Sequence, residues 1–235
     1  MGSSNLATIA LYLDQKKNVL ANRIPGSRQW HYDDRPVCEP EARRADYCAD
    51  GNCASVQITR HYRKLIDKHS TVDERRFAVQ VLVHLVGDVH QPLHASDHDD
   101  RGGNDVRVHF ALSGGQPRTT DLHSAWDTDF VKAAFATADE RKIARDLLTA
   151  YSDSIKSWQR GAAAAWLAES CAIARATAYG KLPGFLCSGD DGGDFGVERL
   201  ELDAAYVAEA TSIVPQQLVK ARARIAYLLN RAFAK

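Results

Sequence analysis

The histidines of this chain are concentrated in one region. Five of the nine lie in the 26 residues from His84 to His109, and His123 follows shortly afterwards. His84 and Asp88 are four residues apart, and His123 and Asp127 repeat that spacing. Because residues four apart share one face of a helix, each pair can present an imidazole and a carboxylate side by side. Both groups are zinc ligands, so the pattern predicts a metal site between two facing helices.

His94 lies between the two pairs, just after Pro92, where it can reach back from a loop. An isolated His-x-x-x-Asp pair is typical of an ordinary hydrogen bond on a helix face. Two such pairs inside apolar stretches favour a multi-metal site, because a polar group buried without a partner is costly. The absence of a paired cysteine ligand motif favours an open catalytic site over a closed structural one.

The elements that would carry these residues are mostly helical. Apolar spacing predicts helices over 6–20, 54–68 and 73–89, a loop over 30–53, and further helical stretches over about 122–149, 152–179 and 203–234. We expect Pro92 to end the helix before it and Pro215 to break or kink the last one. Alternation over 106–110, followed by Gly114 and Gly115, predicts a short strand that reverses. We therefore expect a single, mainly α domain over 1–235: a helical bundle with a small β-hairpin insertion.

The composition excludes some classes of protein. The 235 residues can bury a substantial core, and no apolar run is long enough for a membrane span or has the pattern of a signal peptide. The 30 Lys and Arg balance the 30 Asp and Glu, so the formal net charge is zero. This balance argues against a protein that holds nucleic acid mainly through a broad basic surface. It leaves open a site where bound metal supplies the positive charge.

Four ordered motifs resemble one known family. They are Trp-His-Tyr-Asp-Asp at 30–34, His-Leu-Val-Gly-Asp-Val-His-Gln-Pro-Leu-His at 84–94, Arg-Gly-Gly-Asn at 101–104, and Leu-His-Ser-Ala-Trp-Asp at 122–127. Together they resemble the zinc-dependent single-strand nucleases of the S1/P1 type, distant relatives of zinc-dependent phospholipase C. The resemblance runs from about residue 6 to 233 and implies a mostly helical fold with three zinc ions at the bottom of a cleft.

The resemblance also implies the zinc ligands. Those of the first zinc match Asp14, His31, His84 and Asp88, and those of the second match His94, His123 and Asp127. Asp88 would also bridge to a third zinc. In the family, the third zinc is held by the amino nitrogen and carbonyl of an N-terminal Trp and by a nearby His, and neither residue occurs here before Asp14. We therefore expect an N-terminally shortened domain with two complete zinc sites and an incomplete third.

The activity implied by the family is hydrolysis of single-stranded DNA and RNA to 5′-nucleotides, with additional 3′-nucleotidase activity. Asp88 would position the attacking hydroxide. Lys17, where the family usually has Arg, and Asn104 would contact phosphate, while Tyr32 would stack on a base that Asp34 hydrogen-bonds. Taken alone, residues 102–104 favour a plain turn, and Tyr32 is equally typical of core packing. His90 is expected to orient a neighbouring group, and the remaining histidines, Trp30 and Trp126 to have structural roles.

Five cysteines leave at least one unpaired. The resemblance implies a Cys48–Cys53 disulfide, with Cys38–Cys187 as a plausible second and Cys171 free in an apolar helix. The alternative is that all five are reduced in the cytosol. Disulfides would imply a periplasmic or secreted protein, and we expect it to be a monomer. Two other functions remain open at this point: a zinc-dependent phospholipase C, and a zinc-binding remnant whose incomplete third site impairs catalysis.

Overall fold

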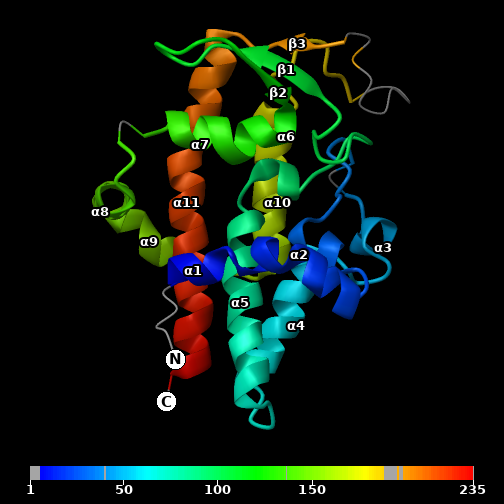
Figure 1. Ribbon diagram of the computed structural model, residues 1–235, viewed down its shortest axis with the longest axis vertical. Coiled ribbons are helices and arrows are strands. Elements are labelled where there is room, and N and C mark those ends of the chain that lie inside the picture. The colour runs from blue at the N-terminus through cyan, green and yellow to red at the C-terminus, as the bar shows by residue number, and fades with distance from the viewer. Residues whose placement is uncertain (1–5, 40, 136, 188–194, 196–197, 235) are drawn as a thin grey trace.

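Four helices run along the long axis of the molecule and form its frame (Figure 1). They are α4 (Ala54–Ile66), α5 (Val72–Asp88), α10 (Ala163–Ile173) and α11 (Ala204–Phe233). The computed structural model describes residues 6–39, 41–135, 137–187, 195 and 198–234. Within these residues the protein is mainly α with one small sheet, which confirms the fold class predicted from the sequence.

Helix α5 follows its sequence signals closely. Its first turn is a capping box, in which Glu74 N donates to Thr71 Oγ1 at 3.2 Å and Thr71 N donates to Glu74 Oε2 at 2.8 Å. Its buried residues include Val81, Leu82 and Leu85. Asp88 is an exception to the usual preference for positive charge at a helix C-terminus, because a carboxylate in the last turn faces the negative end of the helix dipole. Such a residue needs positive partners from elsewhere in the fold.

The N-terminal segments cross the frame near the middle of α5. The predicted helix over 6–20 is divided into α1 (Leu6–Ala10) and α2 (Tyr12–Arg23), and both pack against α5. A 3₁₀ turn, η1 (Ser27–His31), then brings His31 toward the same helix. The long loop that follows contains one short helix, α3 (Arg44–Tyr47), which apolar spacing did not indicate.

A small sheet covers the upper end of the frame (Figure 1). Strands β1 (Arg107–Phe110) and β2 (Arg118–Asp121) form the predicted hairpin, and β3 (Leu200–Glu201) adds to β1 in parallel. The strand order is β2-β1-β3. Strand β3 has two residues, too few to show alternation, so the sequence pattern could not predict it.

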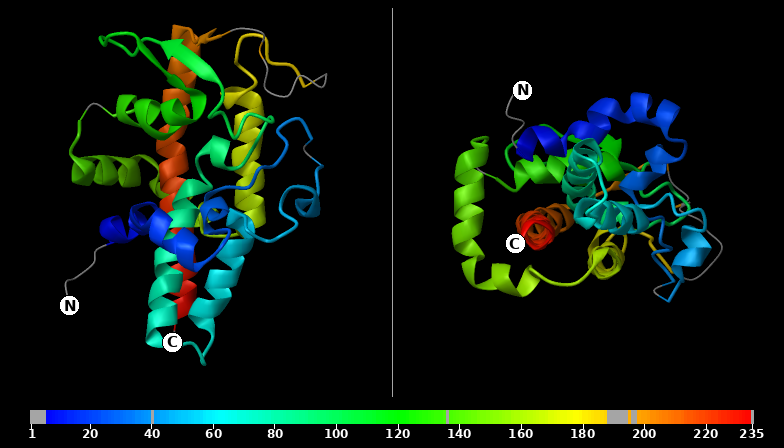
Figure 2. Two further views of the ribbon diagram at one scale, coloured as in Figure 1. Left: turned by 45° about the vertical axis from the view of Figure 1, so that its right-hand side comes forward. Right: turned by 90° about the horizontal axis from the view of Figure 1, so that it is seen from below.

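Two of the long predicted helical stretches are interrupted. The stretch over 122–149 divides into α6 (Leu122–Ser124), the π turn η3 (Ala125–Asp129), α7 (Phe130–Ala133) and α8 (Glu140–Ala150). The stretch over 152–179 divides into α9 (Ser152–Trp158), α10 and the π turn η4 (Ala174–Ala178). Gly161 lies between α9 and α10 and has a left-handed backbone, with φ at 84°. Seen from below, α8 and α9 lie outside α11 (Figure 2).

Pro215 does not break the last helix, contrary to the prediction, because α11 is continuous from Ala204 to Phe233. Proline inside a helix costs about 3 kcal/mol through a lost hydrogen bond and a steric clash. Val214, Gln217 and Val219 are buried around it. Packing of these side chains offsets that cost and keeps the helix intact.

The core consists of two clusters, and the segment between α5 and β1 connects them. The lower cluster includes Leu85, Val89 and Ala95, and the upper one includes Leu93 and Trp126. The turn η2 (Pro92–His94) therefore lies at the boundary between the clusters. Residues from the end of α5 and from the region of α6 meet at this boundary.

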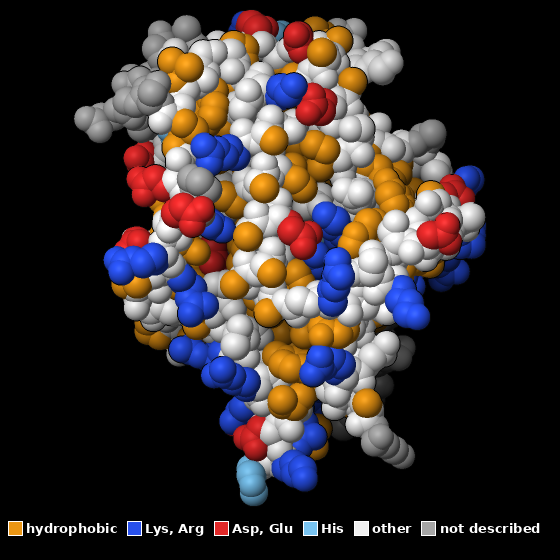
Figure 3. Space-filling model, turned by 180° about the vertical axis from the view of Figure 1, so that it is seen from behind, with side chains coloured by type: hydrophobic (Ala, Val, Ile, Leu, Met, Phe, Trp, Pro, Cys, Tyr) orange, Lys and Arg blue, Asp and Glu red, His pale blue; other side chains and the backbone are white. Residues whose placement is uncertain are grey.

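Two disulfides join the loops, Cys48 to Cys53 and Cys38 to Cys187. Both pairings agree with the prediction, and Cys171 is free and buried. Among the described residues, no helix is long and apolar enough to cross a membrane. On the face seen from behind, Lys and Arg side chains are more frequent in the lower half, where they alternate with apolar side chains (Figure 3).

Candidate metal centre

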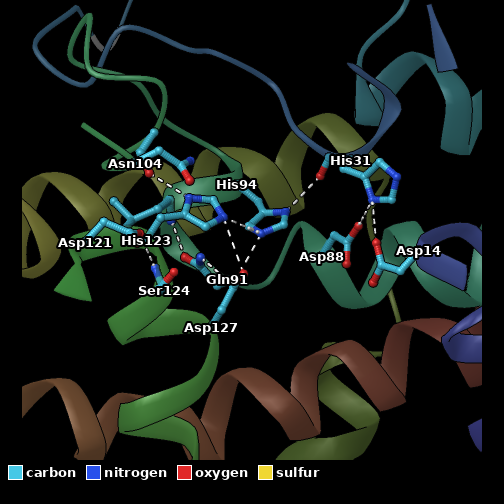
Figure 4. Close-up of polar contacts among 12 residues, drawn as sticks. Asp14, His31, Asp88, Gln91, His94, Asn104, Asp121, His123, Ser124 and Asp127 are labelled. Atoms are coloured by element: carbon cyan, nitrogen blue, oxygen red, sulfur yellow. Dashed lines mark hydrogen bonds and ion pairs between the residues drawn. The ribbon is translucent and has the colours of Figure 1, made fainter. Parts of the chain in front are cut away.

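A first group of ligand atoms lies where α2, η1 and α5 meet; it consists of Asp14, His31, His84 and Asp88. Asp14, His31 and Asp88 are labelled in Figure 4. His31 Nδ1 is 3.0 Å from His84 Nε2 and 3.0 Å from Asp88 Oδ2, and His84 Nε2 is 3.1 Å from Asp88 Oδ2. Asp14 Oδ1 completes the group at 3.8 Å from His31 Nδ1 and 3.7 Å from His84 Nε2. His31 and His84 are buried, whereas the side chain of Asp14 is 61% exposed.

A second group consists of His94, His123 and Asp127. His94 Nε2 and His123 Nε2 are 3.1 Å apart. Asp127 Oδ1 lies 3.4 Å from His94 Nε2, and its Oδ2 lies 3.4 Å from His123 Nε2. Asp127 lies on the π turn η3, which continues directly from the short helix that carries His123. The equal His-x-x-x-Asp spacings therefore belong to two different local structures, α5 and the α6–η3 junction.

Backbone carbonyls orient three of these histidines. His84 Nδ1 donates to the carbonyl of Ala10, His94 Nδ1 to that of His31 at 3.0 Å, and His123 Nδ1 to that of Gly102 at 2.7 Å. Each contact places a proton on Nδ1, so Nε2 is the nitrogen that faces its group and can bind a metal. A second-nitrogen hydrogen bond of this kind is typical of metal-binding histidines.

Two residues connect or support the groups. His31 belongs to the first group through its ring and orients His94 of the second through its carbonyl. Gln91 Nε2 donates to Asp127 Oδ1 at 2.8 Å, and its Oε1 accepts from Leu93 N at 2.5 Å. The sequence reasoning did not assign a role to Gln91, although it lies inside the motif at 84–94.

The electrostatics of both groups favour a bound cation. Burial alone would raise the pKa of Asp88 and Asp127, but hydrogen bonds from the neighbouring histidines hold both well below the ordinary range. Burial opposes charge on His94 too, yet Asp127 and Asp88 raise its pKa to about 9. In the metal-free protein this charge pattern attracts a proton, and a metal ion can take its place.

The spacing of the donor atoms fits zinc. Zinc binds imidazole nitrogen and carboxylate oxygen at about 2.0–2.2 Å in tetrahedral sites, which separates the ligand atoms by about 3.3 Å. The separations between donor atoms given above run from 3.0 to 3.8 Å in the two groups. Nitrogen and oxygen donors without thiolates also match zinc chemistry. The residues of both groups therefore suit the zinc ions that were predicted from the sequence.

Comparison with known proteins agrees with this arrangement. The family model described as S1/P1 Nuclease matches residues 1–234. The chain belongs to the S1/P1 nuclease family. Its relatives include Nuclease S1 of Aspergillus oryzae, 29% identical over 170 residues that make up 68% of this chain and 56% of that protein.

Two further relatives of this S1/P1 family member are a fungal and a plant protein. Nuclease P1 of Penicillium citrinum is 30% identical over 129 residues, 54% of this chain and 45% of that protein. Endonuclease 2 of Arabidopsis thaliana is 26% identical over 248 aligned residues, 97% of this chain and 78% of that protein. The matches to the two fungal proteins thus span about half the length of each.

The four residues predicted to contact substrate differ in exposure in this S1/P1 family member. Lys17 is exposed on α2, one turn after Asp14. Tyr32 is half-buried, and Asn104 is exposed with its Nδ2 donating to Arg101 O at 2.7 Å. Asp34 is exposed, but desolvation of its carboxylate, followed by the charges of Asp97 and Asp33, raises its pKa to about 6.

Asp33 has a structural role that the sequence reasoning missed. Its carboxylate is 2% exposed and accepts hydrogen bonds from Ser55 N at 2.9 Å and Ser55 Oγ at 2.7 Å in the first turn of α4. Its backbone N donates to His94 O at 2.9 Å. Asp33 therefore fixes the segment that carries His31 and Tyr32 to a helix N-terminus, where a carboxylate is stabilised.

His90 and the tryptophans Trp30 and Trp126 have structural contacts. His90 differs from expectation: its Nδ1 donates to Val86 O at 2.7 Å and its Nε2 accepts from Arg224 at 2.8 Å, so it anchors helices instead of orienting a ligand. Burial, followed by the charge of Arg224, lowers the pKa of His90 to about 3. Trp30 and Trp126 are buried in the two core clusters, as predicted.

Proposed function

We propose that this chain is a zinc-dependent phosphodiesterase that hydrolyses single-stranded DNA and RNA to 5′-nucleotides and removes phosphate from 3′-nucleotides. The observation that carries the proposal is the convergence of the two histidine–aspartate groups in a member of the S1/P1 nuclease family. His31, His84, Asp14 and Asp88 would hold one zinc, and His94, His123 and Asp127 another. Bound zinc lowers the pKa of a water molecule toward 7 and neutralises phosphoryl oxygens.

Asp88 would orient the attacking water. Its pKa is held well below the ordinary range by His31 and His84, so it stays ionised at neutral pH and is a weak base. A weakly basic carboxylate accepts a hydrogen bond from water without removing its proton by itself. We therefore assign to Asp88 the positioning of the nucleophile as well as metal binding.

The remaining residues would recognise the strand. Lys17 supplies a positive charge for a phosphate, although it lacks the bidentate geometry of Arg. Asn104 would contact the phosphate, Tyr32 would stack on a base and Asp34 would hydrogen-bond it. Because stacking on a side chain requires a base that is free of its duplex neighbours, this arrangement favours single strands.

The two disulfides support an oxidising location, so we propose a periplasmic or secreted protein. The two histidine–aspartate groups would supply ligands for two zinc ions. The third zinc of the family, and the monomeric state, remain predictions that zinc content and light scattering can test.

The experiment uses the zinc-loaded protein and three substrates: single-stranded DNA, duplex DNA of the same sequence, and phosphatidylcholine. We expect rapid cleavage of the single strand, slow cleavage of the duplex and no lipid hydrolysis. Asp88→Asn should reduce kcat by about 100-fold or more, because it removes a ligand and an orienting group together. The control is Asp73→Asn, which changes an exposed acid on α5. Preferred hydrolysis of the lipid would assign the protein to phospholipase C chemistry, and two bound zinc ions without turnover would assign it as a non-catalytic zinc protein.

A further inference from the structure

The turn between η2 and β1 has an unusual backbone. Asp99 and Arg101 have positive φ angles of 55° and 58°, and Gly102 and Gly103 follow with 62° and 83°. Left-handed backbone is unfavourable for residues other than glycine and persists only where surrounding contacts enforce it. Glycine is needed at 102 for a second reason, because a Cβ there would lie 2.8 Å from Leu93 O. Some other part of the structure must therefore hold this turn.

Two aspartates of the same loop provide that support. Asp97 accepts from Gly102 N at 2.7 Å and from Asp99 N at 3.1 Å. Asp100 Oδ1 accepts from Gly103 N at 2.8 Å and from His98 N at 3.4 Å. The backbone N–H groups that the left-handed turn points inward thus meet carboxylate oxygens of the chain itself.

The contact with Asp100 bears directly on the second group. Gly103 N–H and the Gly102 carbonyl belong to the same planar peptide unit. Asp100 accepts from one side of this unit at 2.8 Å, and His123 Nδ1 donates to the other side at 2.7 Å. Because the unit is rigid, fixing its N–H also fixes the direction of the carbonyl that orients His123.

Asp100 is itself held by a residue from a distant part of the sequence. Tyr179, just after η4, donates its O–H to Asp100 Oδ1 at 2.7 Å. Both side chains are buried, with exposures of 0% for Tyr179 and 2% for Asp100, and Asp100 Oδ2 has no hydrogen-bond partner among the described residues. Burial and the nearby Asp100 keep the pKa of Tyr179 well above its ordinary value, so the phenol remains a donor. Its ring stacks on Phe185 with centroids 5.7 Å apart.

We propose that Tyr179 is a positioning residue for the second group: through Asp100 it fixes the peptide unit that orients His123 and the turn that presents Asn104. The part that concerns Asn104 rests on the function proposed above, whereas the part that concerns His123 requires only that the second group binds zinc. Neither Tyr179 nor Asp100 touches the group directly.

Tyr179→Phe tests the proposal, because it removes the O–H and keeps the ring that stacks on Phe185. We expect the zinc affinity of the second group to fall about fivefold, somewhat less than for loss of a residue that contacts a ligand directly. Competition with a chromophoric chelator measures this affinity. The affinity of the first group should change less. With single-stranded DNA, kcat should fall and KM should rise, because both His123 and Asn104 are less well positioned.

Tyr206→Phe is the matched control. Tyr206 is also buried in the upper cluster, and its hydroxyl donates to Ala178 O at 2.8 Å and accepts from Trp126 Nε1 at 3.1 Å, so both hydrogen bonds are to residues other than Asp100 and the turn. We expect it to lower the unfolding midpoint in urea by as much as Tyr179→Phe does, with unchanged zinc affinity. Equal zinc affinities of Tyr179→Phe and the wild type would overturn the proposal, even if the protein cleaves DNA.

A double-mutant cycle tests the route through Asp100. In an Asp100→Ala background that binds zinc, Tyr179→Phe should have no further effect on zinc affinity, because the contact that it acts through is gone. Independent, additive losses would show that Tyr179 acts by another route and would contradict the proposal. Asp100→Asn, which keeps an oxygen acceptor for Tyr179 and Gly103, should retain more affinity than Asp100→Ala. Since these readouts need no substrate, they remain informative if the protein proves not to be a nuclease.

Discussion

At the scale of single residues, Gln91 shows how a side chain outside the ligand set supports the site. It joins the carboxylate of Asp127 to the backbone of η2, at 2.8 Å and 2.5 Å respectively. The side chain of Asp127 is 40% exposed, so water competes for its oxygens. A fixed amide donor limits the orientations that the carboxylate can adopt.

We therefore expect Gln91→Ala to weaken zinc binding at the second group by about 10-fold, the lower end of the range for such partners. The first group, which Gln91 does not contact, should lose less affinity. Chelator competition measures both. Gln216→Ala, which changes an exposed glutamine on α11, is the control, and an equal effect of the two substitutions would exclude a specific role for Gln91.

Asp34 provides a prediction about pH. Desolvation, with Asp97 and Asp33 nearby, raises its pKa from 3.8 to about 6 in the folded protein. Between these values the folded state binds more protons than the unfolded state, so this residue lowers stability as the pH rises from about 4 to 6. We expect Asp34→Asn to be more stable than the wild type at pH 7 by about 1 kcal/mol, a value reduced for the exposure of the carboxylate. At pH 4 the difference in urea unfolding should vanish; a constant difference at both pH values, or the same behaviour in Asp99→Asn, would contradict the assignment.

The residue types of the site could be predicted from the sequence, but their supporting contacts could not. The repeated spacing of His84 with Asp88 and of His123 with Asp127 is local information, as helical geometry relates residues four apart. The carbonyls of Ala10 and Gly102 reach His84 and His123 from 74 and 21 residues away. Every residue carries a carbonyl, so no residue type marks these acceptors in the sequence.

At the scale of elements, a buried polar network ties the end of α5 to α10 and α11. Arg224 donates to His90 Nε2 at 2.8 Å and to both oxygens of Glu169 at 2.6 and 2.7 Å. Gln217 donates to His90 O at 2.8 Å. The network therefore fixes the chain between Asp88 of the first group and His94 of the second.

Arg224→Met should destabilise the protein by about 2 kcal/mol, because His90 loses its donor in the core. The loss stays below that of a fully buried ion pair, since the side chain of Glu169 is 43% exposed and Lys220 remains beside it at 3.2 Å. Urea denaturation of the zinc-free protein measures the change. Lys220→Met, which keeps Arg224 in place, should cost less than about 1 kcal/mol, and an equal cost would show that the contact with His90 contributes little.

Elements with strong local signals were predicted well, and those set by tertiary contacts were not. Apolar spacing predicted α5 over 73–89, within one residue of its observed bounds at each end. The continuity of α11 through Pro215 depends on its packing, and the pairing of β3 with β1 depends on a partner about 90 residues earlier, between Val108 and Leu200. Neither the packing around α11 nor the partner of β3 can be inferred from the neighbouring sequence.

At the scale of the whole molecule, the two disulfides close loops of very different lengths. Cys38 and Cys187 are 149 residues apart, and Cys48 and Cys53 are 5 apart. In the chain-entropy model the long loop contributes about 5 kcal/mol and the short one about 2 kcal/mol, because cross-links restrict the unfolded chain.

Replacing Cys38 and Cys187 by Ser should therefore lower the free energy of unfolding about twice as much as replacing Cys48 and Cys53. The comparison is made by urea denaturation under oxidising conditions. Under reducing conditions the difference between the two variants should disappear; a larger loss for the short loop would indicate that its disulfide stabilises the folded segment around residues 48–53 directly.

His31 links the two groups, and this link should affect how they bind zinc. Its ring is part of the first group, and its carbonyl orients His94 of the second. A zinc ion that immobilises the ring also orders the backbone on which the second group depends. Occupancy of one position should thus favour occupancy of the other, and thermodynamic reciprocity makes the coupling equal in both directions. Singly loaded molecules would then be less populated than two independent sites would give, and removal of zinc from one position would weaken binding at the other.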